Sequence, residues 1–193
     1  MSHAQERQRE IYVSGLSGRR PRIPVDYQKL RAAARRKLSA EAFAYIDGGA
    51  GREDTIDHNR RAFRAWRIRP RMLRDVSRRD TSITLFGRSL PTPFLLAPIG
   101  VLELAHRRAD QAVARPAAAA NIPMVFSNQA SVDMETCAAG MGEAPRWFQL
   151  YWSKNNELVA SLVRRAEACG CEAIVVTLDT TMLGWRPRDL DLA

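Results

Sequence analysis

The chain has 193 residues, of which 46% are apolar and 26% charged, so it is long enough to fold around a core. Its 30 Lys and Arg against 21 Asp and Glu give a formal net charge of +9, but the arginines are scattered and no aromatic residues alternate with them. No apolar run approaches the roughly 18 residues that span a bilayer. We therefore expect a protein that binds neither nucleic acid nor a membrane, and a basic nucleic-acid binder is the less favoured alternative.

The cysteine content points to a reducing compartment. The three cysteines are an odd number, and none has a histidine or a second CxxC at metal-ligand spacing. This pattern predicts free thiols, no metal site and a cytoplasmic location.

The first 90 residues predict an N-terminal region of short elements. Residues 1–24 carry glycines and prolines among charges, which indicates an irregular arm. Apolar spacing over 25–45 predicts two short helices, with Asp26 and Ser39 as N-caps. The glycines at 48–51 either end a helix or shape a pocket, a third helix is predicted over 54–64, and a hairpin over 81–90 with its turn at 86–88.

After residue 91 short apolar segments alternate with Ala-rich helical ones. We predict strands over 94–98, 124–127, 147–151 and 173–178, and helices over 108–120, 133–139 and 155–169. Such alternation is typical of an α/β fold with a parallel sheet. No GxGxxG or P-loop motif opens a unit, so a (β/α)8 TIM barrel is the predicted architecture. Residues 1–90 would form the N-terminal arm, helices and hairpin, and 91–193 the first half of the barrel, with about four βα units and a charged loop at its end. Pro116 predicts a kinked, shortened or restarted first barrel helix.

Polar residues and a glycine stand at the carboxyl ends of the predicted strands, where barrels carry their functional groups. The amides and hydroxyls could donate hydrogen bonds to a flavin, and Gly100 would let the ring approach the backbone. Ser127 and Thr177 taken singly also suit turns, and Tyr151 a core position. Gln149 is harder to explain, because a buried amide without a partner costs about 1–3 kcal/mol. The residues at these strand ends are Pro98, Ile99, Gly100, Ser127, Gln149, Tyr151 and Thr177.

Five segments in order resemble the FMN-dependent α-hydroxy acid oxidoreductases, a family that includes glycolate oxidase and lactate oxidase. They are AYIDGGA at 44–50, RPR at 69–71, LAPIG at 96–100, FQLY at 148–151 and TLDT at 177–180. The segments EIYVSG at 10–15 and GWRPRD at 184–189 are most similar to the lactate 2-monooxygenase branch.

The resemblance implies a cofactor and a role for each matching residue. FMN would lie against the backbone of Pro98, Ile99 and Gly100 and accept hydrogen bonds from Ser127, Gln149 and Thr177. Tyr45 and Arg186 would hold the substrate carboxylate, and Tyr151 would lie beside the substrate hydroxyl.

The implied activity is oxidation of a small, lactate-like L-2-hydroxy acid to the 2-oxo acid, with decarboxylation in the monooxygenase branch. Oxygen or another acceptor would reoxidise the flavin. The family's base, a histidine in a Ser-Asn-His-Gly-Gly stretch, has no counterpart in these 193 residues. We therefore expect an N-terminal half without a catalytic residue of its own, inactive alone and part of a homo-oligomer when complete. The alternative is a truncated, non-catalytic fragment that binds flavin weakly.

Overall fold

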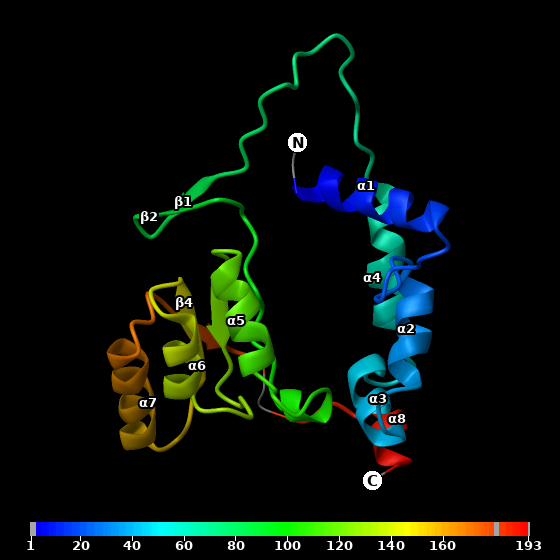
Figure 1. The fold of residues 1–193 in the computed structure, drawn as a ribbon. Helices are drawn as coiled ribbons and strands as arrows, with labels where there is room; N and C mark the ends of the chain where they lie inside the picture. The colour runs from blue at the N-terminus through cyan, green and yellow to red at the C-terminus, as the bar shows by residue number, and fades with distance from the viewer. Residues whose placement is uncertain (1–2, 180–181, 193) are drawn as a thin grey trace. The chain divides into compact units, whose positions relative to one another are not determined.

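The structure is a computed structural model that describes residues 3–179 and 182–192 (Figure 1). Its contacts divide the chain into two compact units. The first comprises the described residues of Met1–Ala50 and Arg186–Ala193, and the second comprises those of Gly51–Trp185. These units divide the chain at other points than residue 90, and the boundary at 90 stays a prediction.

The first unit consists of helices in its described part. They are α1 (His3–Leu16), α2 (Tyr27–Arg35), α3 (Ala40–Asp47) and α8 (Pro187–Leu190). The two helices predicted over 25–45 are confirmed, together with their caps. Asp26 Oδ1 accepts the N–H of Lys29 at 2.9 Å, and Ser39 Oγ accepts that of Ala42 at 3.2 Å.

Two expectations for this unit are wrong. The supposed irregular arm contains the 14-residue helix α1, because its Gln, Glu and Arg residues are good helix formers and Arg7 pairs with Glu10 at 2.6 Å one turn away. Gly15 lies within the last turn of α1, and the chain leaves the helix only after it, where Gly18 has a φ of +73°. The charged end of the chain is not all loop either, because Pro187 starts the short helix α8.

The second unit begins with helix α4 (Asp54–Ala62), the 3-10 turn η1 (Phe63–Ala65) and a hairpin. The hairpin pairs β1 (Ile83–Leu85) with β2 (Arg88–Leu90), as predicted, around the two residues Phe86 and Gly87. Both have positive φ, 49° and 79°, which matches the twist of a tight hairpin.

A parallel sheet forms the centre of the second unit. Its order is β3 (Met124–Phe126), β4 (Arg146–Tyr151) and β5 (Ile174–Thr177). The connecting helices, α6 (Met134–Met141) and α7 (Asn156–Ala168), lie side by side with α5 (Gln111–Ala119) in Figure 1. The predicted alternation of strands and helices is therefore confirmed for these elements, and the sheet is open in the described chain.

The first predicted barrel strand and the first barrel helix differ from expectation. Residues 94–98 form only a parallel bridge, between Leu96 and Met124, because Pro93 and Pro98 cannot donate backbone hydrogen bonds beside it. Helix α5 starts three residues later than predicted but continues through Pro116. The turn η2 (Leu102–Leu104) lies between them.

The two faces of the sheet have different roles. Phe148 and Leu150 in β4 are at most 2% exposed and belong to the core with residues of β3 and α5–α7. Because side chains alternate along a strand, Gln149 and Tyr151 lie on the opposite face. The helix-covered face therefore holds the sheet together, and the other face carries the polar residues. No helix among residues 3–179 and 182–192 is long and apolar enough to cross a membrane.

Candidate functional site

The carboxyl edge of the sheet brings together four of the predicted flavin or substrate residues. Tyr151 and Thr177 are the last residues of β4 and β5 and are paired in register. Ser127 directly follows β3, and its Oγ accepts the N–H of Gln129 at 3.1 Å. The residue after it, Asn128, donates its N–H to Gln149 Oε1 at 3.1 Å. This edge of the second unit is thus a connected polar surface.

Gln149 is buried, with 2% of its surface exposed, and only part of its amide is satisfied. Its Oε1 accepts the Asn128 hydrogen bond, whereas its Nε2 has no hydrogen-bond partner among the described residues. A buried N–H group without an acceptor costs about 1–3 kcal/mol. The side chain is therefore poised to donate to a ligand that carries acceptor atoms.

The segment that would lie against the flavin is anchored to the loop after β3. Val101 donates its N–H to Gln129 O at 3.0 Å. Val101 also has a φ of +46°, a conformation that strains a β-branched residue and is typical of functional segments. A Cβ at Gly100 would lie 3.2 Å from Gln129 Cβ, so Gly100 permits this close approach. Pro98 and Ile99 precede it in the same segment.

In the first unit, the structure brings Arg186 to Tyr45, 141 residues away in sequence. The Arg186 guanidinium lies 5.0 Å from the centre of the Tyr45 ring, a cation–π contact. Its Nη2 donates to Tyr45 O and, at 3.1 Å, to Gly48 O, and its Nε donates to Asp189 Oδ2 at 2.6 Å. The two residues expected to bind a carboxylate are thus in direct contact.

Apart from the resemblance, no sequence pattern indicated the carboxylate that lies beside this pair. The Asp47 side chain is only 8% exposed. Its carboxylate accepts hydrogen bonds from Arg31 Nε at 2.5 Å, Arg31 Nη2 at 2.6 Å and Arg188 Nη1 at 2.8 Å. The hydrogen bonds from Arg31 hold the pKa of Asp47 below its usual value, with Arg188 adding to the effect. The AYIDGGA segment at 44–50 contains Asp47, but it did not indicate which side chains bind this carboxylate.

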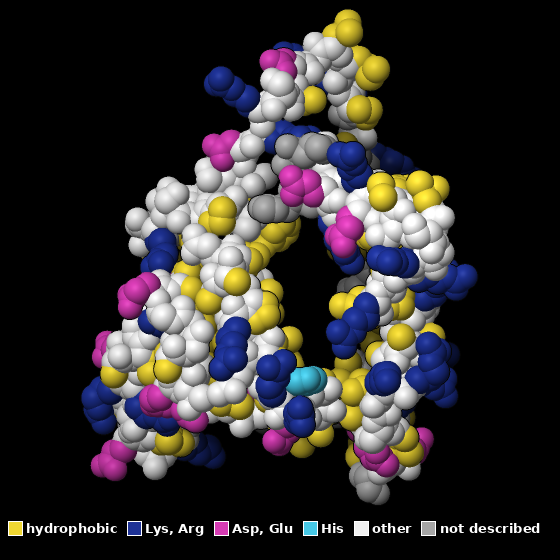
Figure 2. Space-filling view, viewed as in Figure 1, with side chains coloured by type: hydrophobic (Ala, Val, Ile, Leu, Met, Phe, Trp, Pro, Cys, Tyr) yellow, Lys and Arg dark blue, Asp and Glu magenta, His cyan; other side chains and the backbone are white. Residues whose placement is uncertain are grey.

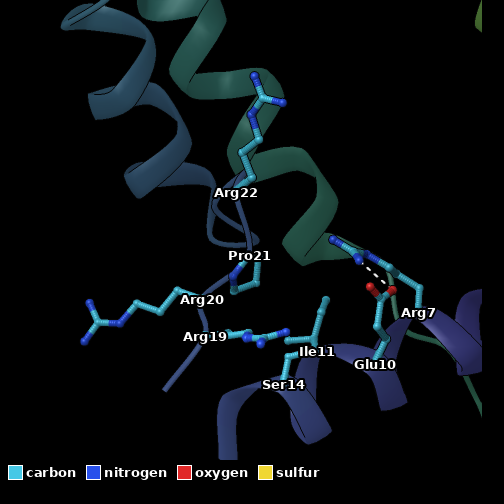
Figure 3. Close-up of a pocket in the computed structure, with 8 residues that line it drawn as sticks. All are labelled: Arg7, Glu10, Ile11, Ser14, Arg19, Arg20, Pro21 and Arg22. Atoms are coloured by element: carbon cyan, nitrogen blue, oxygen red, sulfur yellow. Dashed lines mark hydrogen bonds and ion pairs between the residues drawn. The ribbon is translucent and has the colours of Figure 1, made fainter. Parts of the chain in front are cut away.

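Arginines also line a hollow of about 330 Å³ on α1 and the turn that follows it (Figure 3). Arg7 is bound to Glu10 there, and the side chains of Arg20 and Arg22 point in different directions. On the face drawn in Figure 2, Lys and Arg occur in many separate places. The hollow contains none of the predicted site residues and adds none to the site.

The described chain offers no other obvious reaction centre. No group of three or more His, Cys, Asp or Glu side chains in it could hold a metal ion. His106 uses Nδ1 to accept the N–H of Arg108 at 3.1 Å, which is a local turn contact. Burial raises the pKa of Cys137 to about 11 and that of Cys171 to about 12, so both thiols are poor nucleophiles at neutral pH.

Comparison with known proteins decides the family. Residues 34–193 match the model of the FMN-dependent dehydrogenases. The chain belongs to this family. It is 41% identical over 181 residues to L-lactate oxidase from Lysinibacillus sphaericus, covering 94% of this chain and 47% of that protein. It is 42% identical over 166 residues to 4-hydroxymandelate oxidase from Amycolatopsis orientalis, covering 86% and 46% respectively.

The solved structures agree with the family. The crystal structure of mandelate oxidase with benzoyl-formic acid matches at a TM-score of 0.81 and 40% identity, over 88% of this chain and 50% of that one. The chain therefore spans about half the length of the relatives it matches. The family fold is a TIM barrel, of which the described parallel sheet and helices form an unclosed part.

The predicted site residues are thus found in two groups, one in each unit. Tyr45 and Arg186 meet in the first, and the strand-end residues gather in the second. Thr180, the last residue of the TLDT segment, lies outside the described residues. Sequence patterns missed Asp47, Asp189 and the Gln129 anchor, which act through contacts distant in sequence or through backbone atoms.

Proposed function

We propose that the protein carrying this chain oxidises a small L-2-hydroxy acid to the 2-oxo acid with FMN as cofactor. The observation that carries the proposal is the buried Gln149 amide, whose Nε2 lacks an acceptor, in a chain of an FMN-dependent family. Relatives include proteins named L-lactate oxidase, 4-hydroxymandelate oxidase and (S)-2-hydroxy-acid oxidase, which supports a 2-hydroxy acid as the substrate class.

The residues on the carboxyl edge fit FMN by their chemistry. Its isoalloxazine ring presents carbonyl and ring-nitrogen acceptors, and Gln149 Nε2 is a buried donor that needs one. Ser127 and Thr177 add hydroxyl donors at neighbouring strand ends, and Gly100 leaves room for close backbone approach. When bound, FMN supplies the acceptor for the hydride that leaves the substrate carbon.

Substrate binding in this proposal falls to Arg186, Tyr45 and Tyr151. Nε and Nη2 of Arg186 are used within the first unit, while its Nη1 has no hydrogen bond to the described residues and can donate to a carboxylate. Tyr151 supplies a phenol for the substrate hydroxyl. The base that removes the hydroxyl proton is, in this proposal, a histidine outside these 193 residues.

Within the 2-hydroxy acids we propose a short substrate such as lactate, with oxygen as acceptor and some oxidative decarboxylation. The decarboxylation proposal rests on Gly100, which has no side chain in the segment that would lie against the flavin. An added methyl would meet Gln129 Cβ at 3.2 Å and press on that side chain. Gly100→Ala should therefore shift the products of lactate from acetate toward pyruvate and hydrogen peroxide. Equal acetate fractions in both forms would contradict the decarboxylation proposal.

The central test measures flavin and turnover together. The purified full-length protein that carries this chain should show flavin absorbance and oxidise L-lactate or L-mandelate in preference to the D-forms. Gln149→Met removes the amide donor at similar volume and should weaken FMN binding about tenfold, because one hydrogen bond of about 1.4 kcal/mol corresponds to that factor. Gln28→Met, on exposed α2, is the matched control and should leave FMN binding unchanged.

Two outcomes would count against the proposal. A protein that retains no FMN and oxidises none of these acids would refute the function as a whole. Equal FMN affinity in wild type and Gln149→Met would refute the role of the amide. Both hypotheses predict no turnover from residues 1–193 alone. The alternative, a truncated non-catalytic fragment with weak flavin binding, predicts in addition that the full-length protein that carries this chain oxidises none of these acids. A homo-oligomer and a cytoplasmic location remain predictions from the sequence.

A further inference from the structure

Asp47 connects three helices of the first unit. It is the last residue of α3, it accepts two hydrogen bonds from Arg31 of α2, and it accepts one from Arg188 of α8. Its side chain is 8% exposed, whereas those of Arg31 and Arg188 are 38% and 41% exposed. A nearly buried carboxylate with two cationic partners is much stronger than a surface ion pair, because water screens it less.

The end of α3 and the start of α8, which Asp47 and Arg188 join, also surround Arg186. Asp47 stands between Tyr45 and Gly48, whose carbonyl oxygens accept from Arg186 Nη2, and Arg188 follows Arg186 by two residues. The bond between Asp47 and Arg188 therefore spans the same junction as the Arg186 contacts. Asp189 lies three residues after Arg186 in the same short segment, so it orients the guanidinium without attaching α8 to α3.

The charges of this cluster also favour an anion. Asp47 faces two arginines, and Asp189 faces Arg186. The five side chains together carry one net positive charge, which an incoming carboxylate would balance. Neutralising Asp47 would raise that charge, so a purely electrostatic effect would strengthen anion binding and a positioning effect would weaken it.

We propose that Asp47 is a positioning residue for substrate recognition. Through Arg188 it fixes α8 against the end of α3, and it thereby holds Arg186 over the Tyr45 ring with Nη1 available to the substrate carboxylate. This inference rests on the proposed function of Arg186 in binding 2-hydroxy acids. It adds a residue that touches neither substrate nor flavin.

The test is Asp47→Asn in the flavin-loaded protein, because Asn keeps the shape and removes the charge. We expect KM for the 2-hydroxy acid, and Kd for pyruvate measured by flavin absorbance, to rise about tenfold or more, with kcat within about threefold. Hydrogen exchange of amides in 186–192 should accelerate, while exchange in β3–β5 should not change. Asp57→Asn is the matched control, since Asp57 is 70% exposed and lies 3.9 Å from Arg60.

The outcomes separate the positioning role of Asp47 from the proposed oxidation of 2-hydroxy acids. Unchanged or lower KM and Kd in Asp47→Asn would overturn the inference while leaving the proposed oxidation intact. If the wild-type protein oxidises no 2-hydroxy acid, the proposed function fails, and hydrogen exchange alone then decides whether Asp47 holds α8. If Asp47→Asn does not fold, Arg188→Gln removes one bond and leaves the Arg31 pair. It should reproduce the same changes, and normal KM in that variant would overturn the inference.

Discussion

Arg146 is a buried cation that joins two helix ends, and its removal should destabilise the second unit. It is the first residue of β4 and only 9% exposed. Its Nε donates to Cys169 O, the C-cap of α7, at 2.6 Å. Its Nη1 donates to Gly142 O, the C-cap of α6, and more weakly to Ala138 O at 3.4 Å. One guanidinium thus caps the negative ends of two helices.

Arg146→Met tests this arrangement at similar side-chain length. The two shorter of the three hydrogen bonds come from a charged donor and contribute about 1.5–3 kcal/mol each, and relief from burying the charge offsets part of that. We expect a net loss of about 2–4 kcal/mol in the free energy of unfolding. The measurement is urea unfolding followed by Trp fluorescence, since Trp147 is adjacent, with hydrogen exchange to locate the loss at the ends of α6 and α7.

A matched control separates burial from charge. Arg165 forms a bidentate salt bridge with Glu135 at 2.7 and 2.9 Å, but both side chains are nearly half exposed. Arg165→Met should therefore cost less than about 1 kcal/mol. If Arg146→Met costs no more than Arg165→Met, buried capping of the two helices is not what stabilises this unit.

Three further predictions follow from single positions. Gly48→Ala should lower the free energy of unfolding in urea by about 1–3 kcal/mol, because the added Cβ would lie 2.5 Å from Ala44 O. In the control Gly15→Ala, the added Cβ meets nothing within 4 Å and should not destabilise the protein. Equal effects of the two substitutions would contradict the clash. The Cys171 thiol, whose pKa burial raises to about 12, should resist iodoacetamide at pH 8 until denaturant is added, and rapid labelling of folded protein would contradict its burial. Because Arg31 lowers the Asp47 pKa, the stability lost in Asp47→Asn should be constant above about pH 5 and shrink as pH falls through the folded pKa; a loss that persists in acid would contradict an ionic role.

Local features of the sequence determined most elements and the chemistry of the strand ends. Asp26 and Ser39 predicted the starts of their helices, because N-capping needs only a side-chain acceptor and a backbone N–H three residues later. The buried strands followed from apolar runs, and Gln149 stood out because an amide in such a run requires an explanation. Helix α1 was not predicted, because residues 1–24 were treated as one segment rich in glycine and proline. These residues occur only from position 15 onward, at and after the end of the helix.

Contacts distant in sequence were decided only by the tertiary structure. The Arg186 and Tyr45 pair could be expected from resemblance, but its geometry depends on Asp47, Arg31 and Arg188, which no spacing rule connects. The orphaned Gln149 Nε2 likewise became visible only once every neighbour was placed. Spacing along a chain encodes helices and strands through local hydrogen bonds, whereas burial and charge pairing arise when remote segments exclude water from each other.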